Sequence, residues 1–336
     1  MNPFFTIQWH ITDKCDQRCK HCYIYNGDST VDTELSLEQL KLVLDDFVCS
    51  CSKMERKPML TITGGDPLLN GNIWKFLTLL HERNVKFSIL GNPFHLNDKV
   101  AEKLKKLGCY NYQMSLDGLK ETHDFIRKPG SFDATISKIK CLNDFGIHST
   151  IMTTVSRTNI GEIDKLVPII VDAGAKNFGF ARYCPSENDK NLMVSPQEYR
   201  EFLERMWKVY TEYKNCGTRF SLKDHLWKLF LFEKGLFDIS YEEDIIYDGC
   251  HCGISHMTIL PNGDVYACRR CDSLVGKVPE QSIYQIFMSD AMDEYRQFDK
   301  YEKCSKCELM RFCRGCPAVA KSATGNFYAS DPQCWK

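Results

Sequence analysis

The sequence predicts an α/β fold of parallel strands joined by helices, followed by a smaller cysteine-rich domain. Short apolar runs alternate with helical patterns through the first two-thirds of the 336 residues, and parallel neighbours require such crossover helices. From Cys250 onward, nine of the last 87 residues are cysteine and long regular elements fade. Strand order does not follow from this pattern, because an open doubly wound sheet and a partial barrel fit it equally well.

Each of the six predicted strands is a short apolar run that ends in polar or helical sequence. The strands span Phe5–His10, Met59–Thr63, Lys86–Leu90, Tyr110–Ser115, Ser149–Val155 and Asn177–Arg182.

The segments between the strands carry apolar residues at helical spacing. The first helix follows Ser36, which forms a capping box with Gln39. Further helices are expected at 70–83, 97–107, 132–145 and 159–173, the last two ending at Gly146 and Gly174, and at Pro196–Tyr213 and Leu222–Phe232. We therefore expect a core domain over 1–220, a helical linker over 221–249 and a cysteine-rich domain over 250–336.

Composition limits the class of partner and the compartment. The 43 basic and 44 acidic residues nearly cancel, so no overall field favours nucleic acid or an anionic membrane. The N-terminal stretch does not resemble a secretion signal, and no apolar run approaches membrane-spanning length. We expect a soluble, cytoplasmic protein.

The 18 cysteines point to metal binding. In a reducing compartment they are not expected to form disulfides. The C-terminal domain is poor in apolar periodicity, so we expect metal to organise it. Five cysteines have no partner spacing and are expected to pack as small side chains: Cys49, Cys51, Cys109, Cys141 and Cys216.

Cys15, Cys19 and Cys22 form a CxxxCxxC triplet directly after the first predicted strand. Three thiolates on one short loop can hold three irons of a cubane and leave the fourth iron open to a ligand. Structural zinc is the alternative, but it normally needs a fourth ligand, and His21 between two of the cysteines is poorly placed to supply it. The triplet therefore favours an open [4Fe-4S] cluster.

The triplet and the segment Thr63–Pro67 together resemble the radical S-adenosylmethionine (SAM) superfamily. Gly64, Gly65 and Asp66 match that family's GGEP segment, which receives the amino group of SAM, with Asp66 in place of the usual Glu. The resemblance implies a partial (β/α)6 TIM-like barrel over the core domain. It also implies that Cys15, Cys19 and Cys22 are catalytic and hold the SAM-binding [4Fe-4S] cluster.

Further residues at strand ends match SAM-binding positions of the family. Ser115 and Arg127 fall in a segment that contacts SAM, and an arginine fork suits its carboxylate. The neighbouring pair His123 and Asp124 could equally cap a helix. In α/β folds the carboxyl ends of strands form the site.

On that rule Asn92 is expected to face the ribose, and Arg182 an acidic group of SAM or substrate. Either residue could instead belong to a surface loop.

The C-terminal cysteines resemble the seven-cysteine SPASM domain of radical SAM maturases, although the Cys313–Cys316 spacing is one residue shorter than usual. The resemblance implies two auxiliary [4Fe-4S] clusters, three in all. One would be held by Cys304, Cys307, Cys313 and Cys334. The other would be held by Cys252, Cys268 and Cys316, with Cys250 favoured as fourth ligand over Cys271 or an open iron.

The resemblance implies reductive cleavage of SAM to a 5′-deoxyadenosyl radical, with electrons from a flavodoxin- or ferredoxin-type reductant and an anaerobic setting. Proteins with this layout mostly modify peptides. The leading hypothesis is therefore a maturase that forms a thioether or carbon crosslink in a ribosomally made, cysteine-containing peptide (a RiPP). The sulfatase-maturing branch carries Asp where this chain has Arg269. Sulfatase maturation or a small-molecule oxidoreductase is the alternative, and an electron-transfer or binding scaffold is a third.

Overall fold

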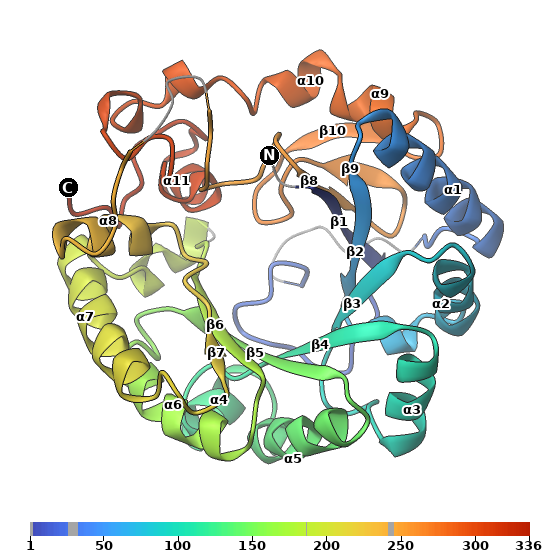
Figure 1. Ribbon diagram of the computed structural model, residues 1–336, viewed down its shortest axis with the longest axis horizontal. Coiled ribbons are helices and arrows are strands. Elements are labelled where there is room, and N and C mark those ends of the chain that lie inside the picture. Colours follow the sequence, from blue (N-terminus) through green and yellow to red (C-terminus); the bar gives the residue numbers. More distant parts are fainter. Residues whose placement is uncertain (1–2, 26–32, 186, 241–244) are drawn as a thin grey trace. The chain divides into compact units, whose positions relative to one another are not determined.

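The computed structural model describes residues 3–25, 33–185, 187–240 and 245–336 (Figure 1). The chain forms two compact units, and each combines segments that are distant in the sequence. Unit 1 comprises Met1–Ser115, Asp124–Thr150 and Cys252–Arg296. Unit 2 comprises Leu116–His123, Ile151–His251 and Gln297–Lys336.

The sheet of unit 1 begins with parallel strands. They are β1 (Phe4–Thr12), β2 (Lys57–Gly64), β3 (Lys86–Leu90) and β4 (Cys109–Ser115). Each contains a predicted strand and pairs in parallel with the next. The predicted parallel α/β class is therefore confirmed, and the strands of this unit lie in the order β10-β9-β8-β1-β2-β3-β4.

Alternation along β1 separates an apolar face from a polar one. Phe5, Ile7 and Trp9 are fully buried, and Trp9 meets Phe76 edge-on at 5.0 Å between ring centroids. His10, the residue after Trp9, is equally buried. Since successive side chains point to opposite sides of a sheet, the face opposite Trp9 presents polar groups near the end of β1.

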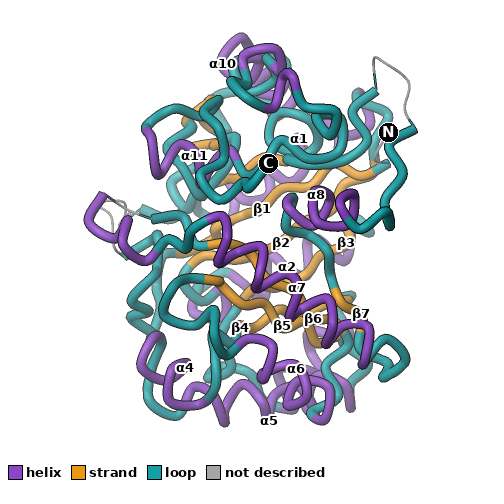
Figure 2. The backbone as a smooth tube through the Cα atoms, turned by 90° about the vertical axis from the view of Figure 1, so that its left-hand side faces the viewer, coloured by secondary structure: helices purple, strands orange, loops and turns teal. Residues whose placement is uncertain are grey.

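Helices follow the strands as expected (Figure 2). Unit 1 contains α1 (Leu37–Lys53), α2 (Ile73–Glu82), α3 (Asp98–Lys106) and α5 (Ser131–Asp144). The short helix α4 spans Lys120–Ile126. The capping box of Ser36 and Gln39 is present at the start of α1. The predicted stops also hold, because Gly146 and Gly174 adopt positive φ values of 65° and 79° just past their helices.

The first half of the cysteine-rich region extends the N-terminal sheet. It contains β8 (His256–Ile259), β9 (Asp264–Tyr266), β10 (Leu274–Lys277), α9 (Ile283–Phe287) and α10 (Asp290–Asp293). β8 pairs in parallel with β1, and β9 and β10 continue antiparallel.

We expected metal to organise this region, but Met257, Ile259, Ile283 and Ile286 are fully buried within unit 1. Elements of three to five residues are too short to reveal this core by periodicity.

Unit 2 is built around aromatic side chains. β5 (His148–Val155) leads into its elements α6 (Ile163–Asp172), β6 (Asn177–Arg182), α7 (Pro196–Glu212), β7 (Arg219–Phe220), α8 (Leu226–Glu233) and α11 (Pro317–Thr324). Short 3-10 turns lie at Glu187–Leu192, Phe298–Lys300 and Cys304–Lys306. Trp227 packs against Phe180, Tyr210 and Phe230 in the core.

In the described part of the chain, no helix combines the length and the apolar character that a membrane crossing needs.

α1 anchors the start of α9 through polar side chains. The Asp46 carboxylate accepts a hydrogen bond from the Ile283 N–H at 2.6 Å, and the Ser50 hydroxyl accepts one from the Tyr284 N–H at 3.0 Å. Both acceptors satisfy N–H groups of the first helical turn, where a negative charge is favourable.

We predict that Asp46→Ala lowers the free energy of unfolding by about 1–2 kcal/mol, because it removes a charged cap. Anaerobic urea denaturation measures this loss. Asp45→Ala is the matched control, since Asp45 forms an ion pair with Arg83 at the surface, and exposed pairs contribute less than about 1 kcal/mol. Equal losses from the two substitutions would contradict the anchoring role.

Candidate iron–sulfur and cofactor site

The cysteine triplet occupies a loop directly after β1. All three thiols are partly accessible. The Cys15 sulfur accepts a hydrogen bond from the Gln17 N–H at 3.4 Å, and Arg127 Nη1 donates to the Cys19 sulfur at 3.7 Å. The loop thus offers three sulfur ligands, and N–H and guanidinium groups donate hydrogen bonds to them. This arrangement fits the negative charge of an iron–sulfur cluster held by thiolates.

The Gly64–Gly65 segment at the end of β2 lies against the strand end that leads into this loop. The Gly65 N–H donates to the Thr12 carbonyl at 2.9 Å, and the Asp66 N–H donates to the Lys14 carbonyl at 2.7 Å. A Cβ on Gly64 would lie 2.0 Å from the Thr12 oxygen, and one on Gly65 would lie 2.3 Å from the Lys14 oxygen. Gly64 also has φ +137°, which other residues rarely adopt. Only glycine permits this approach.

Asp66 presents a buried carboxylate beside the loop. Its side chain caps the short turn η1 (Pro67–Leu69) through a 3.0 Å bond from the Leu68 N–H. Its Oδ2 is buried and has no hydrogen-bond partner among the described residues. Burial raises the pKa of Asp66 to about 6. Side-chain atoms of Asp16 and His95 that could bind a ligand lie within 4.8 Å of the Asp66 carboxylate and of each other. This group of three side chains suits a cationic group such as an ammonium.

Asn92 and Arg127, both expected at the SAM site, contact the cysteine loop. Asn92 Nδ2 donates to Asp16 at 3.0 Å and approaches the Cys15 sulfur at 3.8 Å. A Tyr112 hydroxyl bond to the Asn92 carbonyl, at 3.1 Å, fixes that turn. Ser115 is half-buried and is the last residue of β4, so it lies at the carboxyl end of that strand. Their part in SAM binding stays a prediction.

The pair His123 and Asp124 has local structural roles. The Asp124 carboxylate accepts hydrogen bonds from the N–H groups of Gly130 and Phe132, both at 2.8 Å, and so caps the start of α5. The buried His123 ring accepts a bond from the Asp117 N–H at 3.0 Å. The helix-capping alternative therefore describes Asp124.

Arg182 has protein partners in unit 2. Its fully buried guanidinium bonds to Asp224 at 2.9 Å and to Asp331 at 2.7 Å. Burial alone would raise the pKa of Asp331, but Arg182 holds it below its usual range. The structure thus gives Arg182 two carboxylate partners from the chain itself, in place of the acidic group of SAM or substrate expected from its position. The position of Arg182 in the sequence indicated that it ends a strand, but it did not indicate that Asp224 and Asp331 are its partners.

Four of the C-terminal cysteines line one cavity in unit 2: Cys304, Cys307, Cys313 and Cys334. They are the four that the resemblance assigns to a single auxiliary cluster. Gly315 N–H donates to the Cys313 sulfur at 3.4 Å, and Arg314 and Lys336 also line the cavity. Four thiols around one cavity, with cationic groups beside them, form a donor set that fits an iron–sulfur cluster.

The remaining candidate ligands are divided between the units. Cys252, Cys268 and Cys271 belong to unit 1, and Cys250 and Cys316 to unit 2. The Ser273 hydroxyl donates to the carbonyls of Cys268 and Cys271 at 2.8 and 3.1 Å, so it shapes the turn between them. The second auxiliary cluster and its fourth ligand stay predictions.

Sequence reasoning missed an aromatic and basic group beside the triplet. The Arg269 guanidinium lies over the Tyr23 ring at 5.1 Å, and the His10 ring lies 6.1 Å from Tyr23. Burial lowers the pKa of His10, and Arg269 lowers it further. The sequence did contain a signal for His10, because it is a polar residue inside an apolar strand. It contained none for Arg269, because the position of Arg269 depends on how β8 and β9 join the sheet.

The fold and the three cysteines on the loop after β1 fit an α/β iron–sulfur protein. Comparison with known proteins narrows this class. Residues 9–167 match the radical SAM superfamily, and residues 250–317 match the iron–sulfur cluster-binding SPASM domain. The chain belongs to the radical SAM superfamily and carries a SPASM domain, so it is a SAM-dependent enzyme that uses [4Fe-4S] clusters.

Two curated relatives align along nearly the whole chain. AdoMet-dependent heme synthase of Methanosarcina barkeri is 27% identical over 340 residues, which cover 98% of this chain and 95% of the relative. Mycofactocin maturase MftC of Mycolicibacterium smegmatis is 26% identical over 340 residues, with 98% and 82% covered.

Solved structures share the fold. Streptococcus suis SuiB bound to S-adenosylmethionine superposes with a TM-score of 0.78 at 20% identity, covering 99% of this chain and 78% of that chain. Native anSMEcpe with bound AdoMet gives 0.74 at 19% identity, with 96% and 93% covered. The expected radical SAM fold with its C-terminal SPASM domain is thereby confirmed.

We predict that Gly64→Ala abolishes loading of the N-terminal cluster, because the new Cβ meets the Thr12 carbonyl. Iron content should fall by about four per chain after anaerobic reconstitution. Gly71→Ala is the control, since a Cβ there meets nothing within 4 Å, and it should retain full iron. Normal iron in Gly64→Ala would show that the close approach is dispensable.

We predict that Arg182→Ala destabilises the fold by about 3–5 kcal/mol, because it leaves two buried carboxylates uncompensated. Arg182→Lys should recover part of the loss. Thermal and urea unfolding of the reconstituted variants measure both effects. A loss of SAM binding with unchanged stability would instead return Arg182 to the ligand site.

Proposed function

We propose that the protein is a radical SAM/SPASM peptide maturase, which cleaves SAM reductively and forms a thioether or carbon crosslink in a cysteine-containing peptide. The observation that carries the proposal is likeness along the whole chain to peptide-modifying enzymes. SuiB was solved bound to the precursor peptide SuiA, with a TM-score of 0.79 and 99% of this chain covered. MftC, a maturase, aligns over 98% of the chain.

A second observation weighs against the sulfatase-maturing branch. That branch has Asp at the position of Arg269, and here the Arg269 guanidinium lies over Tyr23, next to Cys22. A cation there cannot serve as the proton acceptor that the branch uses. It favours a substrate that brings negative charge to this side of the loop.

Each group of residues has a distinct part in the proposed reaction. The chemistry supplied by the N-terminal cluster is one-electron cleavage of SAM, which provides the radical that abstracts hydrogen from the substrate. Cys15, Cys19 and Cys22 would hold that cluster. The Gly64–Asp66 segment would orient the amino group of SAM, and Arg127 would bind its carboxylate. The protein thus supplies binding and orientation, as cofactor enzymes generally do.

The four cysteines around the unit 2 cavity would hold an auxiliary cluster. Such a cluster can pass electrons to or from the substrate, with a potential set by its ligands and by burial. We place the reaction in the cytoplasm with a flavodoxin- or ferredoxin-type electron donor, consistent with the many thiols of the chain.

A small-molecule substrate is the second candidate, because the heme synthase relatives align over 98% of the chain. Incubation with SAM and a reductant separates the two. If the protein is a peptide maturase, synthetic copies of short peptides encoded beside its gene should increase the release of 5′-deoxyadenosine. Mass spectrometry should then show that the peptide has lost two hydrogen atoms. Stimulation by Fe-coproporphyrin but by no such peptide would establish the second candidate.

We predict that the triple Ala variant of Cys15, Cys19 and Cys22 binds about four fewer irons than the wild type, which should bind about twelve, and releases no 5′-deoxyadenosine. Replacing Cys49, Cys141 and Cys216 by Ala is the matched control and should change neither quantity. Release from the triplet variant would place the chemistry at another cluster.

A further inference from the structure

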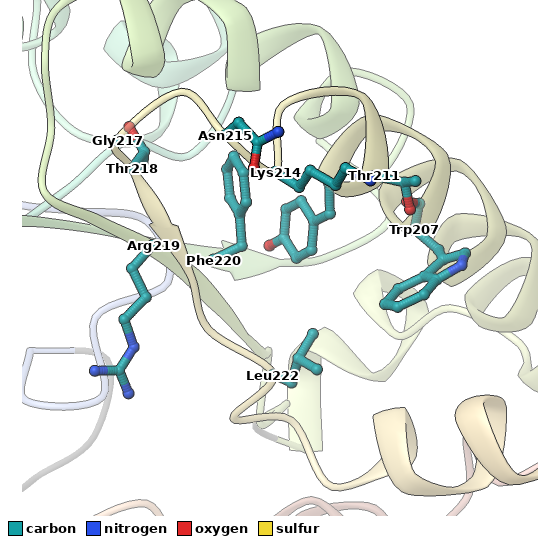
Figure 3. Close-up of a pocket in the computed structure, with 10 residues that line it drawn as sticks. Trp207, Thr211, Lys214, Asn215, Gly217, Thr218, Arg219, Phe220 and Leu222 are labelled. Atoms are coloured by element: carbon teal, nitrogen blue, oxygen red, sulfur yellow. The ribbon is translucent and has the colours of Figure 1, made fainter. Parts of the chain in front are cut away.

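A groove of about 670 Å³ lies in unit 2 between the end of α7 and β7 (Figure 3). Its apolar walls come from Trp207, Phe220 and Leu222, and Lys214 also lines it. Leu222 is 38% exposed. The volume falls within the usual range for binding sites, and the groove plays no part in the cluster and SAM sites described above.

One wall of the groove is an open sheet edge. Among the strands that the structure describes, β7 pairs only with β6, in parallel, with Phe178 opposite Phe220. The Arg219 N–H donates to the carbonyl of Lys176, just before β6, at 2.9 Å, and the Ser221 N–H donates to the carbonyl of Phe178 at 2.7 Å. Because these groups alternate in direction along a strand, the N–H and carbonyl of Phe220 face away from β6. An unpaired edge of this kind is a template for another strand.

A buried hydroxyl also lines the groove. Tyr210 is 5% exposed, and its OH has no hydrogen-bond partner among the described residues. Its ring stacks on Phe220 with centroids 4.4 Å apart, so the hydroxyl is held in place. Leaving such a buried group unsatisfied is unfavourable, and a polar atom of a ligand would remove this cost.

The charge of the groove has one sign. Lys214 and Arg219 are the charged residues among those that line it, and in the part of the chain that the structure describes neither forms an ion pair. Lys214 lies on the side of β7 that carries Phe220 and Trp207, whereas Arg219 extends away from them on the other side of the strand (Figure 3). Lys214 beside the apolar walls, with no carboxylate among the described residues that line the groove, fits an acidic occupant.

We propose that this groove binds an extended acidic segment of the peptide substrate, which adds to the edge of β7 as a further strand. Backbone bonds to Phe220 give affinity in this mode, and alternate side chains give specificity. An apolar side chain of the segment packs between Trp207 and Phe220, and an acidic one pairs with Lys214. The inference rests on the proposed peptide substrate and assigns a docking site separate from the site of chemistry.

Fluorescence anisotropy tests the proposal on the reconstituted enzyme without SAM or reductant. The probe is a labelled synthetic peptide in which Glu alternates with Leu and Val, beside a counterpart with Lys for Glu. The Glu peptide should bind and the Lys peptide should not. Lys214→Glu should weaken binding by about tenfold, whereas Lys208→Glu, an exposed position on α7 outside the groove, should leave it unchanged.

A second pair of variants tests the strand edge. Phe220→Pro removes the outward N–H but leaves the N–H bonds of Arg219 and Ser221 in place, so it should weaken binding more than Phe220→Ala does. Equal binding of both peptides, equal effects of Lys214→Glu and Lys208→Glu, or no Glu-peptide binding would overturn the proposal. So would a dimer in solution that Phe220→Pro dissociates, because the edge would then pair with a second copy.

The two proposals fail separately. Binding is measured without catalysis, and crosslinking is measured by product mass. Crosslinking without groove binding would reject this docking site alone, whereas groove binding without any peptide product would reject the maturase function.

Discussion

The site depends on one close approach of two backbone segments. The Gly64–Gly65 segment at the end of β2 bonds to the carbonyls of Thr12 and Lys14 where β1 runs into the cysteine loop. A side chain at either glycine would push the segments apart. The same contact sets Asp66, with its unsatisfied buried oxygen, beside the loop. Thiol ligands and the predicted SAM-binding backbone are therefore positioned by a single local constraint.

The strand that carries this loop is fixed from both sides. β1 pairs in parallel with β2 and with β8, so a strand of the cysteine-rich region directly supports the strand that leads into the cysteine loop. That pairing also brings Arg269 to Tyr23 beside the triplet. In unit 2, a buried arginine with two carboxylates links β6 to the C-terminal segment that carries Cys334. In each unit, the segment that carries predicted cluster ligands is therefore held by direct contacts to a strand of the sheet.

Sequence alone predicted the six strands and the main helices, because short parallel strands and amphipathic helices have strong local signatures. Cysteine spacing also grouped Cys304, Cys307, Cys313 and Cys334, which line one cavity. The sequence did not predict that β8 joins β1, since parallel pairing between distant segments has no local pattern. For the same reason the partners of Arg182 and the neighbours of His10 were missed. Position in a motif shows which residues lie near a strand end, but long-range packing decides what each of them touches.

The proposed reaction requires that the cluster on Cys15, Cys19 and Cys22 has an open iron that binds the amino and carboxylate groups of SAM. Electron–nuclear double resonance on the reduced protein, with SAM labelled by ¹⁵N at the amino group, tests it most directly. We expect a hyperfine coupling between that nitrogen and the N-terminal cluster, and no such coupling in the triple Ala variant. A reduced N-terminal cluster that shows no coupling at saturating SAM would contradict it.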